Sequence, residues 1–88
     1  MKILDIKHAA TGETRTDGRY PLRIGSTVKF YVSPIVNNCA FLEYIADNQG
    51  NPKKGFLRTS IIQSLEEKED KIILTTMNSI YILSKENN

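Results

Sequence analysis

Two groups of basic residues are the side chains of this 88-residue chain best suited to bind an anion. The candidate binding residues are Arg15, Arg19 and Arg23 in and beside a long loop, Lys53, Lys54 and Arg58 in a second loop and the strand after it, and the tyrosines Tyr20 and Tyr31, with Tyr44 as a further ring. Guanidinium groups present a planar fork of donors that matches phosphate, and tyrosine rings offer faces on which bases stack. Such a basic rim with aromatic residues is typical of a site for a nucleotide or single-stranded nucleic acid. The alternative interpretation is a set of ordinary surface cations and half-buried tyrosines.

Groups for catalysis or metal binding are scarce. The chain has one histidine, His8, and one cysteine, Cys39, which excludes the usual transition-metal sites built from several His and Cys ligands. It contains no P-loop, no G-x-G-x-x-G, no G-x-S-x-G and no H-E-x-x-H motif. The acidic stretch of residues 66–70 is interrupted by a lysine, as is usual in a solvated hairpin tip. We therefore expect no catalytic residue, no metal ion and no cofactor.

Three polar residues are candidates for contacts with a ligand: Thr59, Ser60 and Asn78. Thr59 and Ser60 are adjacent in a predicted strand, so they point to opposite faces and at most one can line a given site. Asn78 lies in the stretch TTMNSIYIL, residues 75–83, where an unbroken strand would have two mixed faces. A tight turn or bulge at residues 77–79 resolves this, because Asn tolerates the left-handed conformation that such a turn requires. The side chains of Asn78 and Ser79 would then hydrogen-bond the local backbone.

Apolar residues at a spacing of two recur along the chain and predict β-strands. The repeats are Leu4 with Ile6, Tyr20 with Leu22 and Ile24, and Val28 with Phe30 and Val32. Residues 37–47 and 60–69 fit either a strand or a short helix. We predict strands, because turn-forming residues follow the first and the second is rich in β-branched side chains. The expected fold class is all-β: a small antiparallel barrel or strongly bent sheet of about six strands, SH3-like or similar, with room for one short helix.

Length and charge limit the remaining possibilities. Residues 1–88 fit one domain with a single small core. Residues 1–64 hold nine Lys or Arg against five acids (+4) and residues 65–88 hold three against five (−2), an asymmetry that favours anionic partners on one side of the domain. The apolar runs are too short for a signal peptide or for the roughly 20 residues of a membrane span, and a lone cysteine suits a reducing compartment. We expect a soluble, cytoplasmic protein with no membrane partner.

Three segments carry a resemblance to other proteins. GFLRTSII and KIILTTMNSIYIL, with LRIGSTV upstream, resemble a pattern in small uncharacterised β-rich proteins of bacteriophages and mobile elements of Gram-positive bacteria, which often end in T-x-N-S-x-Y. The resemblance covers about residues 20–84. It implies an accessory phage protein of the host cytoplasm, of a kind that frequently binds and blocks a host factor, and it assigns no site residues.

These observations lead to two functional hypotheses. The first is a non-catalytic binding protein, phage-borne, that inhibits or sequesters a host component, either a defence protein or its anionic nucleotide signal. The alternative is a regulatory module that binds single-stranded nucleic acid or RNA through the basic rim and its tyrosines. Short strands with little protection at their edges also predict that two copies can pair into a homo-oligomer.

Overall fold

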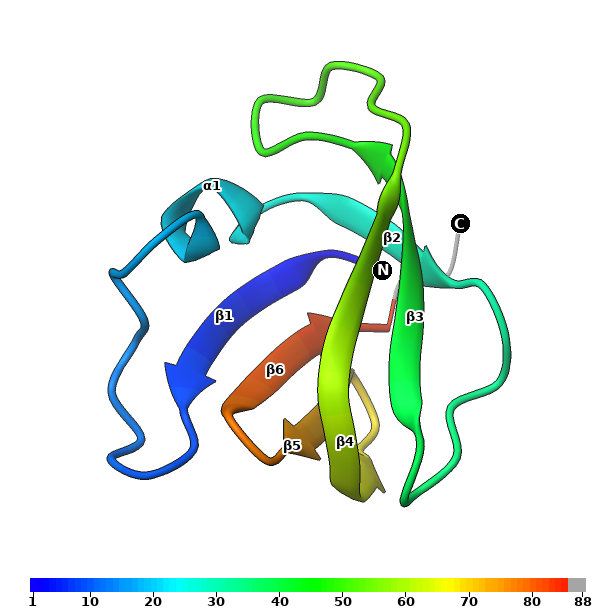
Figure 1. Ribbon diagram of the computed structural model, residues 1–88. Coiled ribbons are helices and arrows are strands. Elements are labelled where there is room, and N and C mark those ends of the chain that lie inside the picture. The colour runs from blue at the N-terminus through cyan, green and yellow to red at the C-terminus, as the bar shows by residue number, and fades with distance from the viewer. Residues whose placement is uncertain (86–88) are drawn as a thin grey trace.

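The computed structural model describes residues 1–85, which form one six-stranded antiparallel sheet and one short helix (Figure 1). The elements are β1 (Ile3–His8), α1 (Tyr20–Arg23), β2 (Thr27–Phe30), β3 (Cys39–Ala46), β4 (Phe56–Glu67), β5 (Lys71–Thr76) and β6 (Ser79–Ser84). The strand order is β1-β6-β5-β4-β3-β2. The sheet curls into a half-barrel, and the expected all-β class is therefore confirmed.

The sheet bends along the long strand β4. Its first half pairs with β3 and its second half pairs with β5, with register shifts at Cys39/Phe41 and at Ile62/Ser64. Each shift inserts an extra residue on one strand, and such bulges bend a sheet and increase its twist. Residues 37–47 and 60–69 lie largely in β3 and β4 and form no helix, so the choice of strand for both segments is confirmed.

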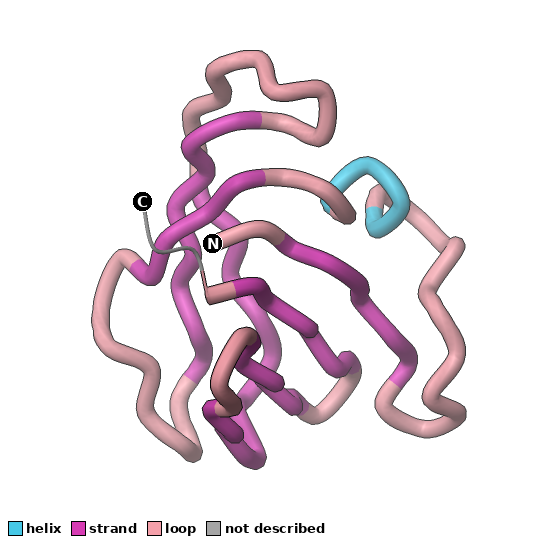
Figure 2. Tube along the Cα trace, turned by 180° about the vertical axis from the view of Figure 1, so that it is seen from behind, coloured by secondary structure: helices cyan, strands magenta, loops and turns pink. Residues whose placement is uncertain are grey.

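The two end strands of the sheet meet where the chain begins (Figures 1 and 2). The Ile3 N–H donates to the Ser26 carbonyl at 2.9 Å, and the Gly25 N–H donates to the Ile3 carbonyl at 2.7 Å. Val28 N–H donates to the Met1 carbonyl at 2.8 Å. Further along β1, the Arg15 N–H of the following loop donates to the Ile6 carbonyl. Part of the outer edge of each end strand is thus paired within the chain.

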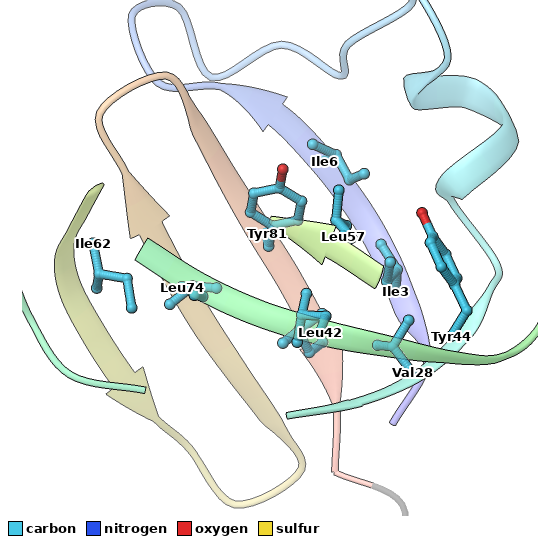
Figure 3. Close-up of a cluster of buried hydrophobic side chains, with 11 residues drawn as sticks. Ile3, Ile6, Val28, Leu42, Tyr44, Leu57, Ile62, Leu74 and Tyr81 are labelled. Carbon is cyan, nitrogen blue, oxygen red and sulfur yellow. The ribbon is translucent and has the colours of Figure 1, made fainter. Parts of the chain in front are cut away.

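The core lies inside the curl and consists of apolar side chains from the strands (Figure 3). The buried residues are Ile3, Ile6, Val28, Ala40, Leu42, Tyr44, Leu57, Ile62, Leu74, Tyr81 and Leu83. The prediction that Leu4 and Ile6 share the inner face was wrong, because Leu4 is 49% exposed while Ile3 and Ile6 are both buried. A register shift between Ile3 and Asp5 explains this, since a one-residue slip moves a side chain to the other face of a strand.

The strand predicted over residues 20–24 is the helix α1. Pro21 occupies its first turn, where a missing N–H costs nothing and the fixed φ of proline suits a helix. The Ile24 N–H donates to the Tyr20 carbonyl at 3.2 Å and closes the single turn. The chain then leaves the helix through Gly25, whose φ of +95° is strained for any residue with a side chain. The alternation of three apolar residues was too short a pattern to distinguish these two structures.

The predicted tight turn near Asn78 is present, because Met77 and Asn78 alone connect β5 to β6. Its chemistry differs from the prediction. Asn78 does not have positive φ, and the side chain that bonds the local backbone is that of Thr76. The buried Thr76 hydroxyl accepts from the Ser79 N–H at 3.1 Å and donates to the Ser79 carbonyl at 3.0 Å.

Candidate anion-binding site

A basic pocket of about 280 Å³ lies between α1 and the loop that joins β3 to β4. We call it the basic pocket; it is lined by Arg19, Leu22, Arg23, Tyr44, Lys53, Lys54, Gly55, Phe56 and Leu57. In both backbone views α1 and the β3–β4 loop lie at the same end of the half-barrel (Figures 1 and 2). Four of the six predicted cations therefore come together. They form two pairs, Arg19 with Arg23 and Lys53 with Lys54, and the pairs lie about 30 residues apart along the chain.

The short helix places the two arginines. Arg19 immediately precedes α1 and is exposed, and Arg23 ends α1 and is half-buried. The Leu22 N–H donates to the Arg19 carbonyl at 3.1 Å, which fixes the start of the turn. The guanidinium carbon of Arg23 lies 4.9 Å from the centre of the Tyr20 ring, a cation–π contact that holds this side chain beside the pocket.

The β3–β4 loop places the two lysines, and Asp47 organises that loop. The Asp47 carboxylate accepts from the backbone N–H groups of Gln49 and Asn51, both at 2.9 Å. The hydrogen bond from the Asn51 backbone N–H, followed in effect by that from Gln49, lowers the pKa of Asp47 below its ordinary value. Further along, the Lys53 N–H donates to the Ile45 carbonyl at 3.1 Å. The loop thus has a defined path up to the residues that line the pocket.

Tyr44 forms the apolar base under one of the lysines. It is 7% exposed and lies at the margin of the buried cluster, beside α1 (Figure 3). The Lys53 ammonium nitrogen lies 4.1 Å from the centre of its ring. Burial raises the pKa of the Tyr44 hydroxyl, so the phenol stays neutral at physiological pH. A neutral ring adds no negative charge that would compete with an anionic ligand.

The two segments that carry the cations approach each other at Gly25 and Asn48, neither of which lines the pocket itself. A side-chain carbon added at Gly25 would lie 3.2 Å from the Asn48 Cβ. Gly25 follows the helix with the arginines, and Asn48 belongs to the loop with the lysines. Only glycine gives both the positive φ and the close approach at this contact.

The four cations of the pocket form no ion pair with a carboxylate of residues 1–85, although Lys53 interacts electrostatically with Asp47 of the same loop. None of the nine lining residues is acidic, and within residues 1–85 no carboxylate lies within ion-pair distance of these four side chains. Like charges held close together around a concave surface focus a positive potential on it. The arrangement is suited to bind an anion such as phosphate by charge-assisted hydrogen bonds.

Two predicted binding residues serve the fold instead of the pocket. Arg15 donates to both carboxylate oxygens of Asp17, at 3.1 and 2.7 Å, and to the Ser79 hydroxyl at 2.7 Å. Its guanidinium carbon also lies 3.9 Å from the centre of the Tyr20 ring. Tyr20 is thereby contacted by both Arg15 and Arg23, and it does not line the basic pocket.

The other predicted residues lie on β4, directly after β2 and in the β5–β6 turn. Tyr31 and Arg58 are exposed near the pocket but do not line it. The buried Thr59 hydroxyl accepts from the Ala40 N–H at 3.0 Å, and the Ser60 hydroxyl accepts from the Asn78 N–H at 3.2 Å. Thr59, Ser60 and Asn78 therefore connect strands and turns, and the structure does not bring them to the basic pocket.

Sequence reasoning missed three apolar residues of the pocket, Leu22, Phe56 and Leu57. Leu22 was assigned to a strand face, whereas α1 exposes it beside the arginines. Phe56 directly follows Lys53, Lys54 and Gly55, and this proximity of an aromatic residue to two lysines was the available signal.

A metal cluster and a membrane-spanning helix are both absent from the described part of the chain. Residues 1–85 contain no group of three or more His, Cys, Asp or Glu side chains placed to hold a metal ion. No helix among them is long and apolar enough to cross a membrane. Comparison with protein-family models finds no match, and comparisons with curated proteins and with solved structures also find none.

Proposed function

We propose that this protein is a non-catalytic binding protein that captures a phosphate-bearing anion in the basic pocket. The observation that carries the proposal is the meeting of Arg19, Arg23, Lys53 and Lys54 around one small concavity with no acidic lining residue. Arginine forks and lysine ammonium groups are the side chains that recognise phosphate oxygens. The pocket volume of about 280 Å³ is at the lower end for small-molecule sites and suits one phosphate-bearing group.

The neutral phenol and the apolar side chains of the pocket have a supporting role. Tyr44, Leu22 and Phe56 lower the local dielectric constant around the cations, and charge interactions are stronger where water is partly excluded. The pocket nevertheless stays open at its rim, because Arg19, Lys53 and Lys54 are all exposed. A larger molecule that presents a phosphate can therefore reach the cations without entering the protein.

The resemblance to small phage proteins extends the proposal to a biological setting. In the host cytoplasm, a protein that captures phosphate-bearing ligands without turning them over would sequester a nucleotide or a nucleic acid from its host receptor. Inhibition of a host defence protein through its anionic ligand is the corresponding role.

Calorimetric titration with inorganic tripolyphosphate tests the proposed site. We expect saturable binding by the wild type and a loss of at least about tenfold in affinity for Arg23→Ala and for Lys53→Ala, since each change removes a charge-assisted hydrogen bond worth about 1.5–3 kcal/mol. Lys68→Ala, at the β4–β5 tip, removes the same charge far from the pocket and is the matched control. Equal affinity in all four proteins, or no binding by the wild type, would contradict the proposal.

A further inference from the structure

A pair of exposed aromatic rings continues the basic pocket onto the outer face of the sheet. Phe56 is the first residue of β4, lines the pocket and is 57% exposed. Tyr31, directly after β2, is 61% exposed. The two rings pack edge to face, with centroids 5.0 Å apart and planes at 80°. Two large aromatic side chains therefore present surface to solvent beside the cations, where a monomeric protein would usually bury them.

The same face carries a further cation and a further ring. Arg58 is exposed two residues after Phe56, and the alternation of a strand directs both side chains outward. The register partner of Arg58 on β3 is the exposed Phe41, whose carbonyl accepts from the Tyr31 N–H at 2.9 Å. The basic pocket, the aromatic pair and Arg58 thus form a continuous track across β2, β3 and β4.

One acidic residue lies on this track, and it is paired. Glu43 lies on β3, where it is the register partner of Phe56 on β4 and of Lys29 on β2. The Lys29 ammonium lies 3.6 Å from the Glu43 carboxylate, which offsets its charge within the sheet face. The track therefore keeps an excess of positive charge next to its aromatic rings.

From this arrangement we infer that the ligand of the basic pocket is single-stranded nucleic acid, bound by a phosphate in the pocket and by bases stacked on Phe56 and Tyr31. The inference rests on the proposed function, because the pocket supplies the phosphate contact. Stacking on protein rings requires bases with open faces, which single strands offer and duplexes do not. Two rings at 80° cannot stack on one base, so the pair accommodates bases of different nucleotides. The aromatic pair therefore favours an oligonucleotide over a mononucleotide as the ligand.

The number of cations on the track sets how strongly the affinity for a single strand should depend on salt concentration. The five cations concerned are Arg19, Arg23, Lys53, Lys54 and Arg58. If about three phosphates contact them, the logarithm of the binding constant falls against the logarithm of salt concentration with a slope of about −2 for a single strand. Such a small slope fits a chain whose net charge is only +2.

Fluorescence anisotropy with a labelled single-stranded oligonucleotide of about eight nucleotides tests the inference. We expect Phe56→Ala and Tyr31→Ala each to weaken binding by about fivefold to a hundredfold, the range for loss of one stacked base. Phe56→Leu keeps the apolar bulk without the aromatic face and is expected to weaken binding as well. Leu65→Ala, an exposed apolar change near the far end of β4, is the control and is expected to leave affinity unchanged. Thermal melts verify that each variant folds.

The outcomes separate this inference from the proposed function. Tyr31 does not line the basic pocket, so a Tyr31→Ala protein that loses the oligonucleotide but binds inorganic tripolyphosphate like the wild type supports both. Aromatic variants that bind the oligonucleotide like the wild type, while Arg23→Ala and Lys53→Ala lose it, would overturn the inference and leave the anion site standing. A duplex of the same sequence that binds as tightly as the single strand would also overturn it. If Arg23→Ala and Lys53→Ala bind both probes like the wild type, the proposed function itself fails.

Discussion

The guanidinium of Arg15 donates a 2.7 Å hydrogen bond to the hydroxyl of Ser79, which lies 64 residues further along the chain. This bond, together with the contacts to Asp17, ties the long loop after β1 to the first residue of β6. Arg15 therefore belongs to the fold, whereas Arg23, in the same stretch of sequence, belongs to the basic pocket. The two arginines should respond to substitution in opposite ways.

Arg15→Ala should lower the free energy of unfolding by about 1–3 kcal/mol, because it leaves the buried Ser79 hydroxyl without its charged donor. Its affinity for tripolyphosphate should stay within about twofold of the wild type once folding is complete. Urea denaturation and calorimetry provide the two measurements. Arg23→Ala is the matched control and should show the reverse pattern. An Arg15→Ala protein with wild-type stability and reduced anion affinity would contradict this division of roles.

Gly25→Ala should be more destabilising than Gly12→Ala, and it should also weaken anion binding. Both glycines have positive φ, which costs a residue with a side chain about 1–3 kcal/mol. Of the two, only Gly25 would bring its new Cβ against another atom, the Asn48 Cβ at 3.2 Å, and this contact would push apart the two segments that carry the cations. Denaturation and tripolyphosphate titration of both variants measure the difference. Equal stability and equal affinity would show that the Gly25–Asn48 contact does not set the pocket.

The sequence predicts the strands to a greater extent than it predicts the basic pocket. Alternating apolar residues and turn-forming stretches predict β3, β4 and the hairpin after β5, because those signals are local. Leu4 and the segment of α1 were misassigned, because a single bulge or a single helical turn changes the face of a side chain without altering composition. The pocket depends on two segments about 30 residues apart that meet only after the sheet curls. Residue types indicated an anion site, but which cations converge required the tertiary structure.

The Arg15–Asp17 pair should make the free energy of unfolding depend on pH in the acid range. Hydrogen bonds from Arg15 lower the pKa of Asp17 from 3.8 to about 2. A carboxylate with a depressed pKa in the folded state stabilises the fold above pH 3.8, and this contribution is lost as the pH falls toward 2. Urea denaturation across this range should therefore show a decline in stability that is smaller in Asp17→Asn. An identical pH dependence in Asp17→Asn and wild type would show that the pair contributes nothing in solution.

Two buried hydroxyls should behave differently when they are removed. The Ser26 hydroxyl is buried and has no hydrogen-bond partner within residues 1–85, so Ser26→Ala should be neutral or raise the free energy of unfolding by up to about 1 kcal/mol. The Thr76 hydroxyl both accepts from and donates to Ser79, so Thr76→Val should lower it by about 1–3 kcal/mol. Thermal or urea denaturation compares the two. Destabilisation by Ser26→Ala as large as that by Thr76→Val would reveal a partner for Ser26.

The most direct test of the basic pocket is an amide proton–nitrogen correlation spectrum of the labelled protein, recorded during titration with inorganic tripolyphosphate. We predict that the largest chemical-shift changes occur at residues 19–25 and 53–57, the two segments that contribute the cations and their supporting residues. Residues 66–70, at the acidic hairpin tip, should change little. Shifts that saturate at these two segments together would establish the anion site, whereas changes spread evenly over all exposed lysines and arginines, or no changes, would contradict it.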